Sequence, residues 1–269
     1  MLVYPSCKIN LGLNITSKRP DGYHNIETVF YPVKWSDALE VTDDGSQPFE
    51  LHISGLGVSG KPENNIIYKA WKLLTEEAKL PPLKVYLHKV LPMGAGLGGG
   101  SSDAAFFLNL VNKKYDIKLS TEKLTGLARK LGADCAFFIE NKPVFAKGKG
   151  DEFESVDLDL KGYHLLVVYP DIISNTKEAY DGVQPAEPAI SLKEIVKKPV
   201  EQWKDLLVND FERSIFTKYP AIAELKIKLY EEGALYASLS GSGSSVFGIF
   251  KDKPKVTLPE NYSCFTSEA

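Results

Sequence analysis

The run from Pro92 to Asp103 constrains this chain more than any other segment, because glycine is concentrated where a packed core would place side chains. Five of the seven residues from Gly94 to Gly100 are glycine, and an apolar run from Ala104 to Val111 follows directly. Each glycine costs conformational entropy on folding and buries no side chain. It does expose backbone N–H groups, which can surround an anion at the positive end of a helix. The segment therefore predicts a phosphate-binding loop that leads into a helix.

Two better-known glycine motifs fit this loop less well. The Walker A loop ends in Gly-Lys-Ser/Thr, and no lysine stands at that position here. Gly94, Gly96 and Gly99 satisfy the spacing of a dinucleotide fingerprint, which also requires an acidic residue about 20 positions later, after a strand. The nearest acid, Asp116, lies in a polar stretch without a buried-strand pattern. A dinucleotide-binding oxidoreductase stays an alternative, and the flanking strand and helix disfavour a flexible linker.

Composition excludes several classes of protein. The chain has 269 residues, of which 43% are hydrophobic and 25% charged, which is typical of a soluble globular protein with one compact unit or two joined lobes. The net charge of -3 argues against a broad nucleic-acid surface. Three widely spaced cysteines predict a reducing compartment without disulfides or structural zinc. No signal peptide or membrane span is visible, so we expect a cytoplasmic protein with neither nucleic acid nor membrane as partner.

Hydrophobic periodicity predicts strands and helices that alternate along the chain, which indicates the α+β class. Strands are expected at 8–15, 26–33, 40–42, 49–53, 83–87 and 165–169. Helices are expected at 66–78 behind an asparagine N-cap, directly after the glycine loop, at 121–131 behind Ser120, and at 222–230. The sequence Arg19-Pro20-Asp21-Gly22 predicts a turn, and Ser240 to Ser245 predicts a glycine–serine turn between two short strands.

Three separated motifs resemble those of the GHMP kinases, a superfamily of small-molecule kinases that includes galactokinase, homoserine kinase and mevalonate kinase. The loop from Pro92 to Ser102 is similar to the ATP-phosphate motif of the superfamily, and Ser240 to Gly243 is similar to its third motif. The first motif, Lys8 to Leu13 followed by Arg19 to His24, is similar to that of one group within it. That group phosphorylates a cytidine-diphosphate-linked methylerythritol in the non-mevalonate isoprenoid pathway. The resemblance covers nearly the whole chain.

The resemblance implies a fold, two substrates and a set of site residues. It implies a two-lobed fold, with residues 1–152 similar to the second domain of ribosomal protein S5, residues 153–269 ferredoxin-like, and the active cleft between them. It implies ATP and Mg²⁺ as cofactors, Asp134 as catalytic base and Lys8 as its partner. The expected ATP contacts are Pro92, Met93, Gly94, Ala95, Gly96, Leu97, Gly98, Gly99, Gly100, Ser101, Ser102, Ser240 and Gly241. The expected contacts with the phosphate acceptor are Asn10, Tyr23, His24, Tyr31, Thr176 and Tyr180. The metal ligands and the oligomeric state stay open.

Two departures and two alternatives accompany this resemblance. Cys135-Ala136 follow Asp134 where most relatives have Val-Pro, so the turn geometry at Asp134 is not settled by the resemblance, and Cys7 stands where a small alanine is usual. Tyr31 could equally belong to the core. A kinase for another small alcohol, such as homoserine or mevalonate, is disfavoured by the segment from Arg19 to His24. A nucleotide sensor without activity is disfavoured because both Lys8 and Asp134 are present.

Overall fold

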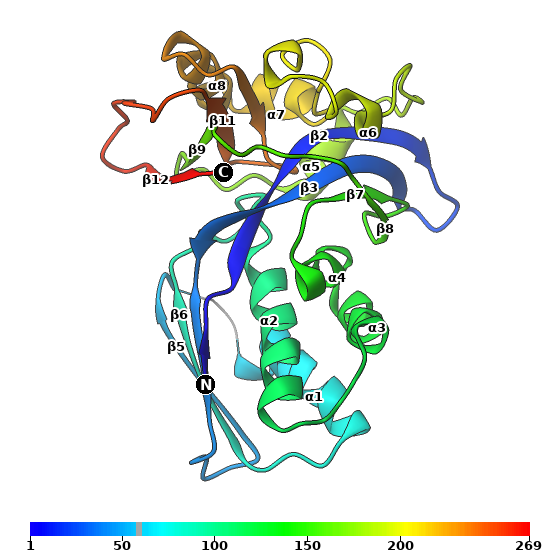
Figure 1. The fold of residues 1–269 in the computed structure, drawn as a ribbon, viewed down its shortest axis with the longest axis vertical. Helices are drawn as coiled ribbons and strands as arrows, with labels where there is room; N and C mark the ends of the chain where they lie inside the picture. Colours follow the sequence, from blue (N-terminus) through cyan, green and yellow to red (C-terminus); the bar gives the residue numbers. More distant parts are fainter. Residues whose placement is uncertain (58–60) are drawn as a thin grey trace. The chain divides into compact units, whose positions relative to one another are not determined.

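The computed structural model describes residues 1–57 and 61–269, and its backbone divides into two compact units. Unit 1 comprises Met1–Cys7, Lys34–Met93 and Gly98–Lys142, and unit 2 comprises Lys8–Val33, Gly94–Leu97 and Pro143–Ala269. Each unit combines three segments that are separated in the sequence, so the division does not follow chain order (Figure 1). The lobes expected at residues 1–152 and 153–269 are a different division, and their boundary stays a prediction.

A four-stranded sheet in the order β1-β4-β6-β5 forms the basis of unit 1. Its strands are β1 (Leu2–Val3), β4 (Ala38–Thr42), β5 (Phe49–Gly55) and β6 (Leu83–Lys89). β6 pairs antiparallel with β4 and parallel with β5. Leu83, Val85, Leu87 and Lys89 are buried along β6, while the residues between them are more exposed. This two-residue period places one face of the sheet on the core.

The helices of unit 1 lie on one side of β5 and β6 (Figure 1). They are α1 (Ile66–Glu77), α2 (Gly99–Lys114), α3 (Thr121–Leu131) and α4 (Ala133–Glu140), with a short 3-10 helix, η1 (Pro62–Asn64), before α1. The Asn65 side chain accepts a hydrogen bond from the Ile67 N–H at 2.9 Å, and Ser120 Oγ accepts one from the Lys123 N–H at 3.3 Å. Both N-caps predicted from the sequence are therefore confirmed.

Two further four-stranded sheets lie largely or entirely within unit 2. The first has the order β2-β3-β7-β8 and consists of β2 (Ser6–Lys18), β3 (His24–Ser36), β7 (Val144–Lys147) and β8 (Glu152–Ser155). The second has the order β10-β11-β9-β12 and is antiparallel throughout. Its strands are β9 (His164–Tyr169), β10 (Tyr236–Leu239), β11 (Val246–Phe250) and β12 (Ser263–Glu268). The predicted glycine–serine turn joins β10 to β11.

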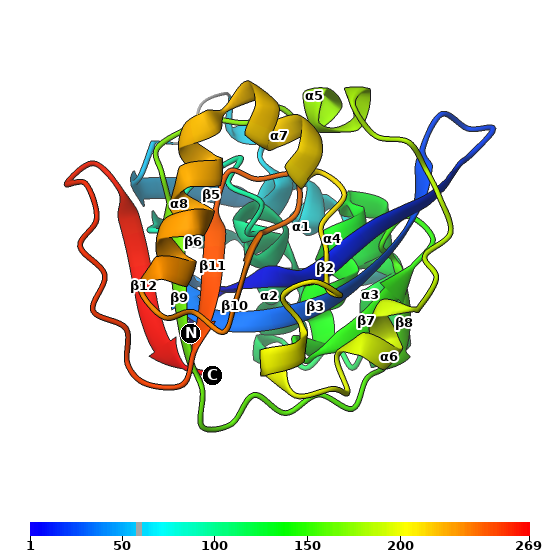
Figure 2. The same cartoon turned by 90° about the horizontal axis from the view of Figure 1, so that it is seen from above.

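The helices α7 (Glu212–Lys218) and α8 (Pro220–Glu231) accompany this second sheet, and α8 packs against β10 and β11 (Figure 2). Ile222, Leu225 and Leu229 of α8 share a buried cluster with Leu239 and Val246 of the sheet. Three shorter helices complete unit 2, namely α5 (Thr176–Asp181), α6 (Leu192–Ile195) and the 3-10 helix η2 (Val200–Gln202). No helix in the described part of the chain is long and apolar enough to span a bilayer.

Candidate active site

The glycine loop, residues 92–98, connects the end of β6 to the start of α2. Gly94, Gly96 and Gly98 have φ angles of 64°, 76° and 71°, in the left-handed region that favours glycine. Gly98 is the N-cap of α2, and its carbonyl oxygen accepts a hydrogen bond from the Ser102 N–H at 2.9 Å. Helix geometry leaves the N–H groups of residues 99–101 without an acceptor inside the helix. The loop therefore offers the backbone donors that an anion requires.

Within unit 2, the turn from Ser240 to Ser245 lies against the middle of this loop. Ser240 Oγ donates to the Gly96 carbonyl oxygen at 2.9 Å, and the Ser245 N–H donates to the Ala95 carbonyl oxygen at 3.1 Å. A Cβ atom on Gly96 would lie 1.9 Å from the Ser240 carbonyl oxygen, so the two backbones approach too closely for any side chain at Gly96. The second and third motifs recognised in the sequence thus meet through their backbones.

Lys8 is only 4% exposed, and hydrogen bonds within unit 2 hold its ammonium group. Lys8 Nζ donates to Asn10 Oδ1 at 2.7 Å and to the Gly96 carbonyl oxygen at 2.9 Å. Asn10 Nδ2 donates in turn to Thr28 Oγ1 at 2.9 Å. A buried ammonium group is costly unless it is paired and hydrogen-bonded, so this chain of contacts places Lys8 Nζ at the glycine loop. Sequence reasoning missed Thr28, which a strand pattern does not distinguish from any other buried residue.

Asp134 lies in the first turn of α4, where the positive end of the helix favours a carboxylate. The sequence showed that an apolar run follows Asp134, but that run is buried on all sides and has no amphipathic period from which a helix could be predicted. Cys135 continues the helix, and its N–H donates to the Gly132 carbonyl oxygen at 3.2 Å. Burial raises the pKa of the Cys135 thiol to about 11, although a hydrogen bond with Ser101 opposes this, so the thiol is not a nucleophile at neutral pH.

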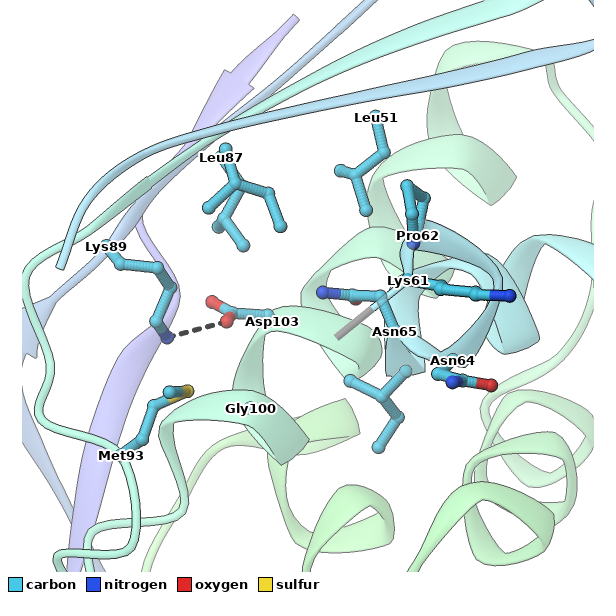
Figure 3. Close-up of a pocket in the computed structure, with 12 residues that line it drawn as sticks. Leu51, Lys61, Pro62, Asn64, Asn65, Leu87, Lys89, Met93, Gly100 and Asp103 are labelled. Atoms are coloured by element: carbon cyan, nitrogen blue, oxygen red, sulfur yellow. Dashed lines mark hydrogen bonds and ion pairs between the residues drawn. The ribbon is translucent and has the colours of Figure 1, made fainter. Parts of the chain in front are cut away.

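A cavity of about 260 Å³ opens in unit 1 beside the start of α2 (Figure 3). Its lining residues are Leu51, Ile53, Lys61, Pro62, Asn64, Asn65, Ile66, Leu87, Lys89, Met93, Gly100 and Asp103. Six of these twelve residues have apolar side chains, and Lys61, Asn64, Asn65, Lys89 and Asp103 add polar groups. This combination is usual for a small-molecule site. Two of the predicted ATP contacts, Met93 and Gly100, line this cavity, which we call the nucleotide cavity.

A second cavity, of about 520 Å³, lies in unit 2 next to the hairpin that joins β2 to β3. Its lining residues are Lys18, Gly22, Tyr23, His24, Lys149, Lys177, Tyr180, Asp181, Val183 and Pro185. The rings of His24 and Tyr180 are stacked with centroids 4.6 Å apart, and Lys149 Nζ lies 5.3 Å from the centre of the Tyr23 ring. Aromatic rings can stack on a nucleobase, and lysines at the rim can bind phosphate groups attached to it. We call it the aromatic cavity.

Comparison with known proteins identifies the family. Residues 65–142 match the family described as GHMP kinases N terminal domain, and residues 191–257 match GHMP kinases C terminal. The 4-diphosphocytidyl-2-C-methyl-D-erythritol kinase of Bacteroides fragilis (strain YCH46) is 56% identical over 272 residues, which cover 100% of this chain and 99% of that protein. This chain belongs to the 4-diphosphocytidyl-2-C-methyl-D-erythritol kinase family.

Comparison with solved structures supports the same family assignment. A crystal structure of 4-(cytidine 5'-diphospho)-2C-methyl-D-erythritol kinase matches with a TM-score of 0.79 at 31% identity, covering 93% of this chain and 90% of that one. The mevalonate kinase of Methanococcus jannaschii matches with a TM-score of 0.68 at 16% identity, covering 99% and 97% of the two chains, which indicates a shared fold alone. The predicted α+β GHMP kinase fold is therefore confirmed.

The structure brings together some of the expected acceptor-binding residues of this family. Tyr23, His24 and Tyr180 all line the aromatic cavity, and Asn10 lies instead beside Lys8. Their roles stay predictions, but the grouping of the three rings is a property of the fold that no sequence pattern supplies.

Two other expected acceptor contacts lie elsewhere. Thr176 begins α5, and its Oγ1 lies 3.1 Å from Ser242 Oγ in the third motif. Tyr31 lies on β3 and lines neither the nucleotide cavity nor the aromatic cavity. Burial raises the pKa of the Tyr31 hydroxyl, and the negative charge of Asp159 adds to the effect, so Tyr31 stays neutral. The core alternative for Tyr31 therefore remains open.

Sequence reasoning missed a buried ionic cluster in unit 1, formed by Asp37, Lys89 and Asp103. Lys89 Nζ donates to Asp103 Oδ2 at 2.8 Å and also to Asp37 Oδ2. Asp37 Oδ1 accepts the N–H groups of Val90 and Leu91 at 2.5 and 2.8 Å. A signal for this cluster did exist, because Lys89 continues the inward-facing series Leu83, Val85 and Leu87 along its strand. The alternation of inward-facing and outward-facing residues along this strand therefore indicates that Lys89 is buried and needs acidic partners.

The cluster contains two carboxyl groups and only one ammonium group. Burial, together with the negative charge of Asp37, raises the pKa of Asp103 to about 8 against the attraction of Lys89. Asp103 Oδ1 has no hydrogen-bond partner among the described residues, whereas both oxygens of Asp37 are bonded. The raised pKa and the unbonded Oδ1 both place a proton on Asp103 at neutral pH.

Proposed function

We propose that this chain catalyses the ATP-dependent phosphorylation of the 2-hydroxyl of 4-diphosphocytidyl-2-C-methyl-D-erythritol in the non-mevalonate isoprenoid pathway. The observation that carries the proposal is the 56% identity, over the full length, to the Bacteroides fragilis kinase of that name. The glycine loop and the two cavities supply the three kinds of site that the reaction needs. A kinase for another small alcohol, such as homoserine or mevalonate, is the alternative, and the aromatic cavity disfavours it because those alcohols carry no base.

ATP occupies the glycine loop and the nucleotide cavity in this proposal. The loop amides bind the phosphates, and the cavity of unit 1 takes the adenosine part. Ser102 Oγ is buried and has no hydrogen-bond partner among the described residues, so its hydroxyl has a donor to spare for a phosphate oxygen. Gly100 lets the phosphates approach the backbone closely, because a Cβ added there would face open space, whereas a Cβ on Gly99 would contact Leu91.

Mg²⁺ is proposed as the ion that accompanies ATP. In the described residues, no three His, Cys, Asp or Glu side chains form a group that could hold a metal by themselves. Mg²⁺ is usually held by substrate phosphates, water and one or two protein ligands, so this residue set fits an ion carried by the nucleotide. When bound, the ion offsets negative charge on the transferred phosphate.

Asp134 is proposed as the base and Lys8 as the cation that orients the acceptor hydroxyl. The pKa of an alcohol is near that of water, about 16, and that of an aspartate is about 3.9. Complete proton transfer before phosphate transfer would therefore be uphill by ~16 kcal/mol. In a loose transition state, however, the proton can leave late, as the new O–P bond forms. The Lys8 ammonium group then offsets the negative charge that develops on the acceptor oxygen.

The acceptor's cytosine is proposed to bind in the aromatic cavity, against Tyr23, His24 and Tyr180. Stacking on aromatic rings contributes ~1–3 kcal/mol per base, which is enough to discriminate between acceptors with and without the nucleotide. In line with the three widely spaced cysteines, which predict no disulfide framework, we propose that the enzyme works in the cytoplasm, where thiols stay reduced.

An assay of ADP release with several alcohols tests the function. We expect turnover with 4-diphosphocytidyl-2-C-methyl-D-erythritol, and a new phosphate ester on its 2-hydroxyl by phosphorus NMR. Free methylerythritol, homoserine and mevalonate serve as matched acceptors that lack the cytidylyl group. Comparable kcat/KM with homoserine or mevalonate would establish the alternative, and no turnover with any alcohol would leave only a nucleotide-binding protein.

A further inference from the structure

The turn that joins β2 to β3 contains the motif Arg19 to His24, and three residues of this motif, Gly22, Tyr23 and His24, line the aromatic cavity. The tip of this hairpin extends beyond the rest of its sheet (Figure 2). The Gly22 N–H donates to the Arg19 carbonyl oxygen at 3.2 Å, and the Arg19 N–H donates to the Tyr23 carbonyl oxygen at 2.8 Å. Gly22 has a φ angle of 86°, so the turn predicted from Arg-Pro-Asp-Gly is formed.

Arg19 spans the turn with its guanidinium group. Arg19 Nε donates to both carboxylate oxygens of Asp21, at 3.2 and 3.1 Å, and Arg19 Nη1 donates to Asn25 Oδ1 at 2.9 Å. Asn25 Nδ2 then donates to Ser17 Oγ at 2.9 Å, on the opposite strand. One planar group therefore ties the tip of the hairpin to the start of β3, and Asn25 extends the link to β2.

Tyr23 depends on this network for its orientation. Its side chain is 62% exposed, so core packing does not set the direction of its ring. Its N–H donates to Asp21 Oδ1 at 3.1 Å, and its carbonyl oxygen is held by the Arg19 N–H. Slight desolvation acts to raise the pKa of Asp21, but the bonds from Tyr23 and Arg19 outweigh it and lower that pKa, so Asp21 is a carboxylate at neutral pH.

An exposed ion pair of this kind contributes little to global stability, so its effect must be local. The side chains of Arg19 and Asp21 are 33% and 46% exposed, and most of their contacts are to residues of the turn itself. A network that fixes a turn without supporting the core fits a role in binding. Pre-ordering an aromatic ring lowers the entropy cost of binding a ligand against it.

We propose that Arg19 is a positioning residue of the aromatic cavity, which holds the 19–23 turn and thereby aims the Tyr23 ring at the cytosine of the acceptor. This inference rests on the proposed function, because it takes a cytidine diphosphate group as the ligand of the cavity. Arg19 does not line the cavity and acts only through Tyr23 and its neighbours.

Calorimetric binding of cytidine diphosphate tests the inference, with Arg19→Ala and Arg19→Lys as variants and Arg213→Ala, at an exposed arginine of α7, as the matched control. We expect Arg19→Ala to raise the Kd at least fivefold, since it impairs one stacking partner. Lysine cannot reach Asp21 and Asn25 at once, so Arg19→Lys should recover only part of the affinity. The KM for ATP and the melting temperature should stay near wild type in all three variants, and Arg213→Ala should also keep the wild-type Kd.

A double-mutant cycle separates positioning from a general structural effect. In a Tyr23→Ala background, Arg19→Ala should change the Kd less than twofold, because the ring that Arg19 aims is gone. An undiminished effect there, full recovery by lysine, or a wild-type Kd in Arg19→Ala would overturn the inference while leaving the function intact. If the wild-type protein neither binds cytidine diphosphate nor phosphorylates the acceptor, the proposed function fails and the inference falls with it.

Discussion

Lys8, Lys89 and Asp103 are ionisable residues that are almost completely buried, and short hydrogen bonds hold each of them in place. Lys8 is bonded to the Gly96 carbonyl oxygen of the glycine loop, and the Lys89–Asp103 pair joins the strand before the loop to the helix after it. Burying such groups is unfavourable unless they are paired. A core would not require charged groups at these positions, so they support the proposal that the glycine loop is a binding site.

Asp134→Asn tests the catalytic base. We expect this variant to lower kcat by ~10²–10⁴, the usual contribution of a positioned acid or base, because asparagine cannot accept the proton. The KM for ATP should change little, since no ATP contact is assigned to Asp134. Steady-state kinetics with both substrates varied makes the measurement. A kcat close to that of the wild type would remove Asp134 from the mechanism.

The variant Asp103→Asn tests whether Asp103 carries a proton in the folded protein. The pKa of Asp103 in the folded chain is about 8, above its ordinary value of 3.8, so the folded state keeps a proton that the unfolded chain has released. The stability that depends on this proton is complete below pH ~4 and is lost as the pH rises toward 8. Between pH 5 and pH 8, the wild type should therefore lose up to ~1.4 kcal/mol of unfolding free energy per pH unit relative to Asp103→Asn.

Urea unfolding of both proteins across that range measures the difference directly. Asparagine keeps the shape of the side chain and stays neutral, so other titrating groups cancel in the comparison. A difference between the two proteins that is constant from pH 5 to pH 8 would show that Asp103 is already ionised.

The glycine loop illustrates, at the scale of one element, how two glycines in the same motif can be needed for different reasons. Gly96 has a positive φ angle and lies against the Ser240 backbone, where a Cβ would be 1.9 Å from the carbonyl oxygen. Gly100 is inside α2 and lines the nucleotide cavity, and a Cβ atom added to it would meet no described atom within 4 Å. The first glycine is required by the fold, and the second leaves room for a ligand.

Alanine at each position separates these two requirements. Gly96→Ala should cost at least ~2 kcal/mol through strain and overlap, which lowers the melting temperature by roughly 4–8 °C or more. Gly100→Ala should melt at or slightly above the wild-type temperature, because alanine is a better helix former. It should nevertheless raise the KM for ATP several-fold, because the added methyl group narrows the cavity. Equal melting temperatures would contradict the close approach at Gly96.

On the scale of the whole molecule, each of the two cavities is complete within one compact unit. The nucleotide cavity consists of residues from unit 1 alone, and the aromatic cavity of residues from unit 2 alone. Under the proposed function, binding energy from the cytidine part of the acceptor can therefore be altered without changing the lining of the nucleotide cavity. Binding energy from a part of the substrate that does not react can position a hydroxyl group that makes few contacts of its own.

Inhibition by cytidine diphosphate checks this division. We expect it to compete with 4-diphosphocytidyl-2-C-methyl-D-erythritol and not with ATP, because it fills the aromatic cavity alone. Free methylerythritol should be a very poor acceptor, since it lacks the group that binds there. Initial rates at several concentrations of each substrate distinguish the patterns. Competition with ATP instead would place the cytidine in the nucleotide cavity.

The sequence by itself determined the features that depend on a few neighbouring residues. The helix starts at Asn65 and Ser120, the turn from Arg19 to Gly22 and the glycine loop were all predicted, because capping and turn geometry depend on residues a few positions apart. The resemblance to GHMP kinases came from the same short motifs. Helix α4 was not predicted, because a run of residues that are all apolar lacks the amphipathic periodicity that identifies a helix.

Only the tertiary structure decided which distant residues meet. Lys8 bonds to Gly96 across 88 positions, Ser240 bonds to Gly96 across 144, and Lys89 finds Asp37 across 52. Tyr23 and Tyr180 line one cavity although they lie on a hairpin and a helix from opposite halves of the chain. Partners at such separations are chosen by how sheets and helices pack and not by local propensity, so no spacing in the sequence records them.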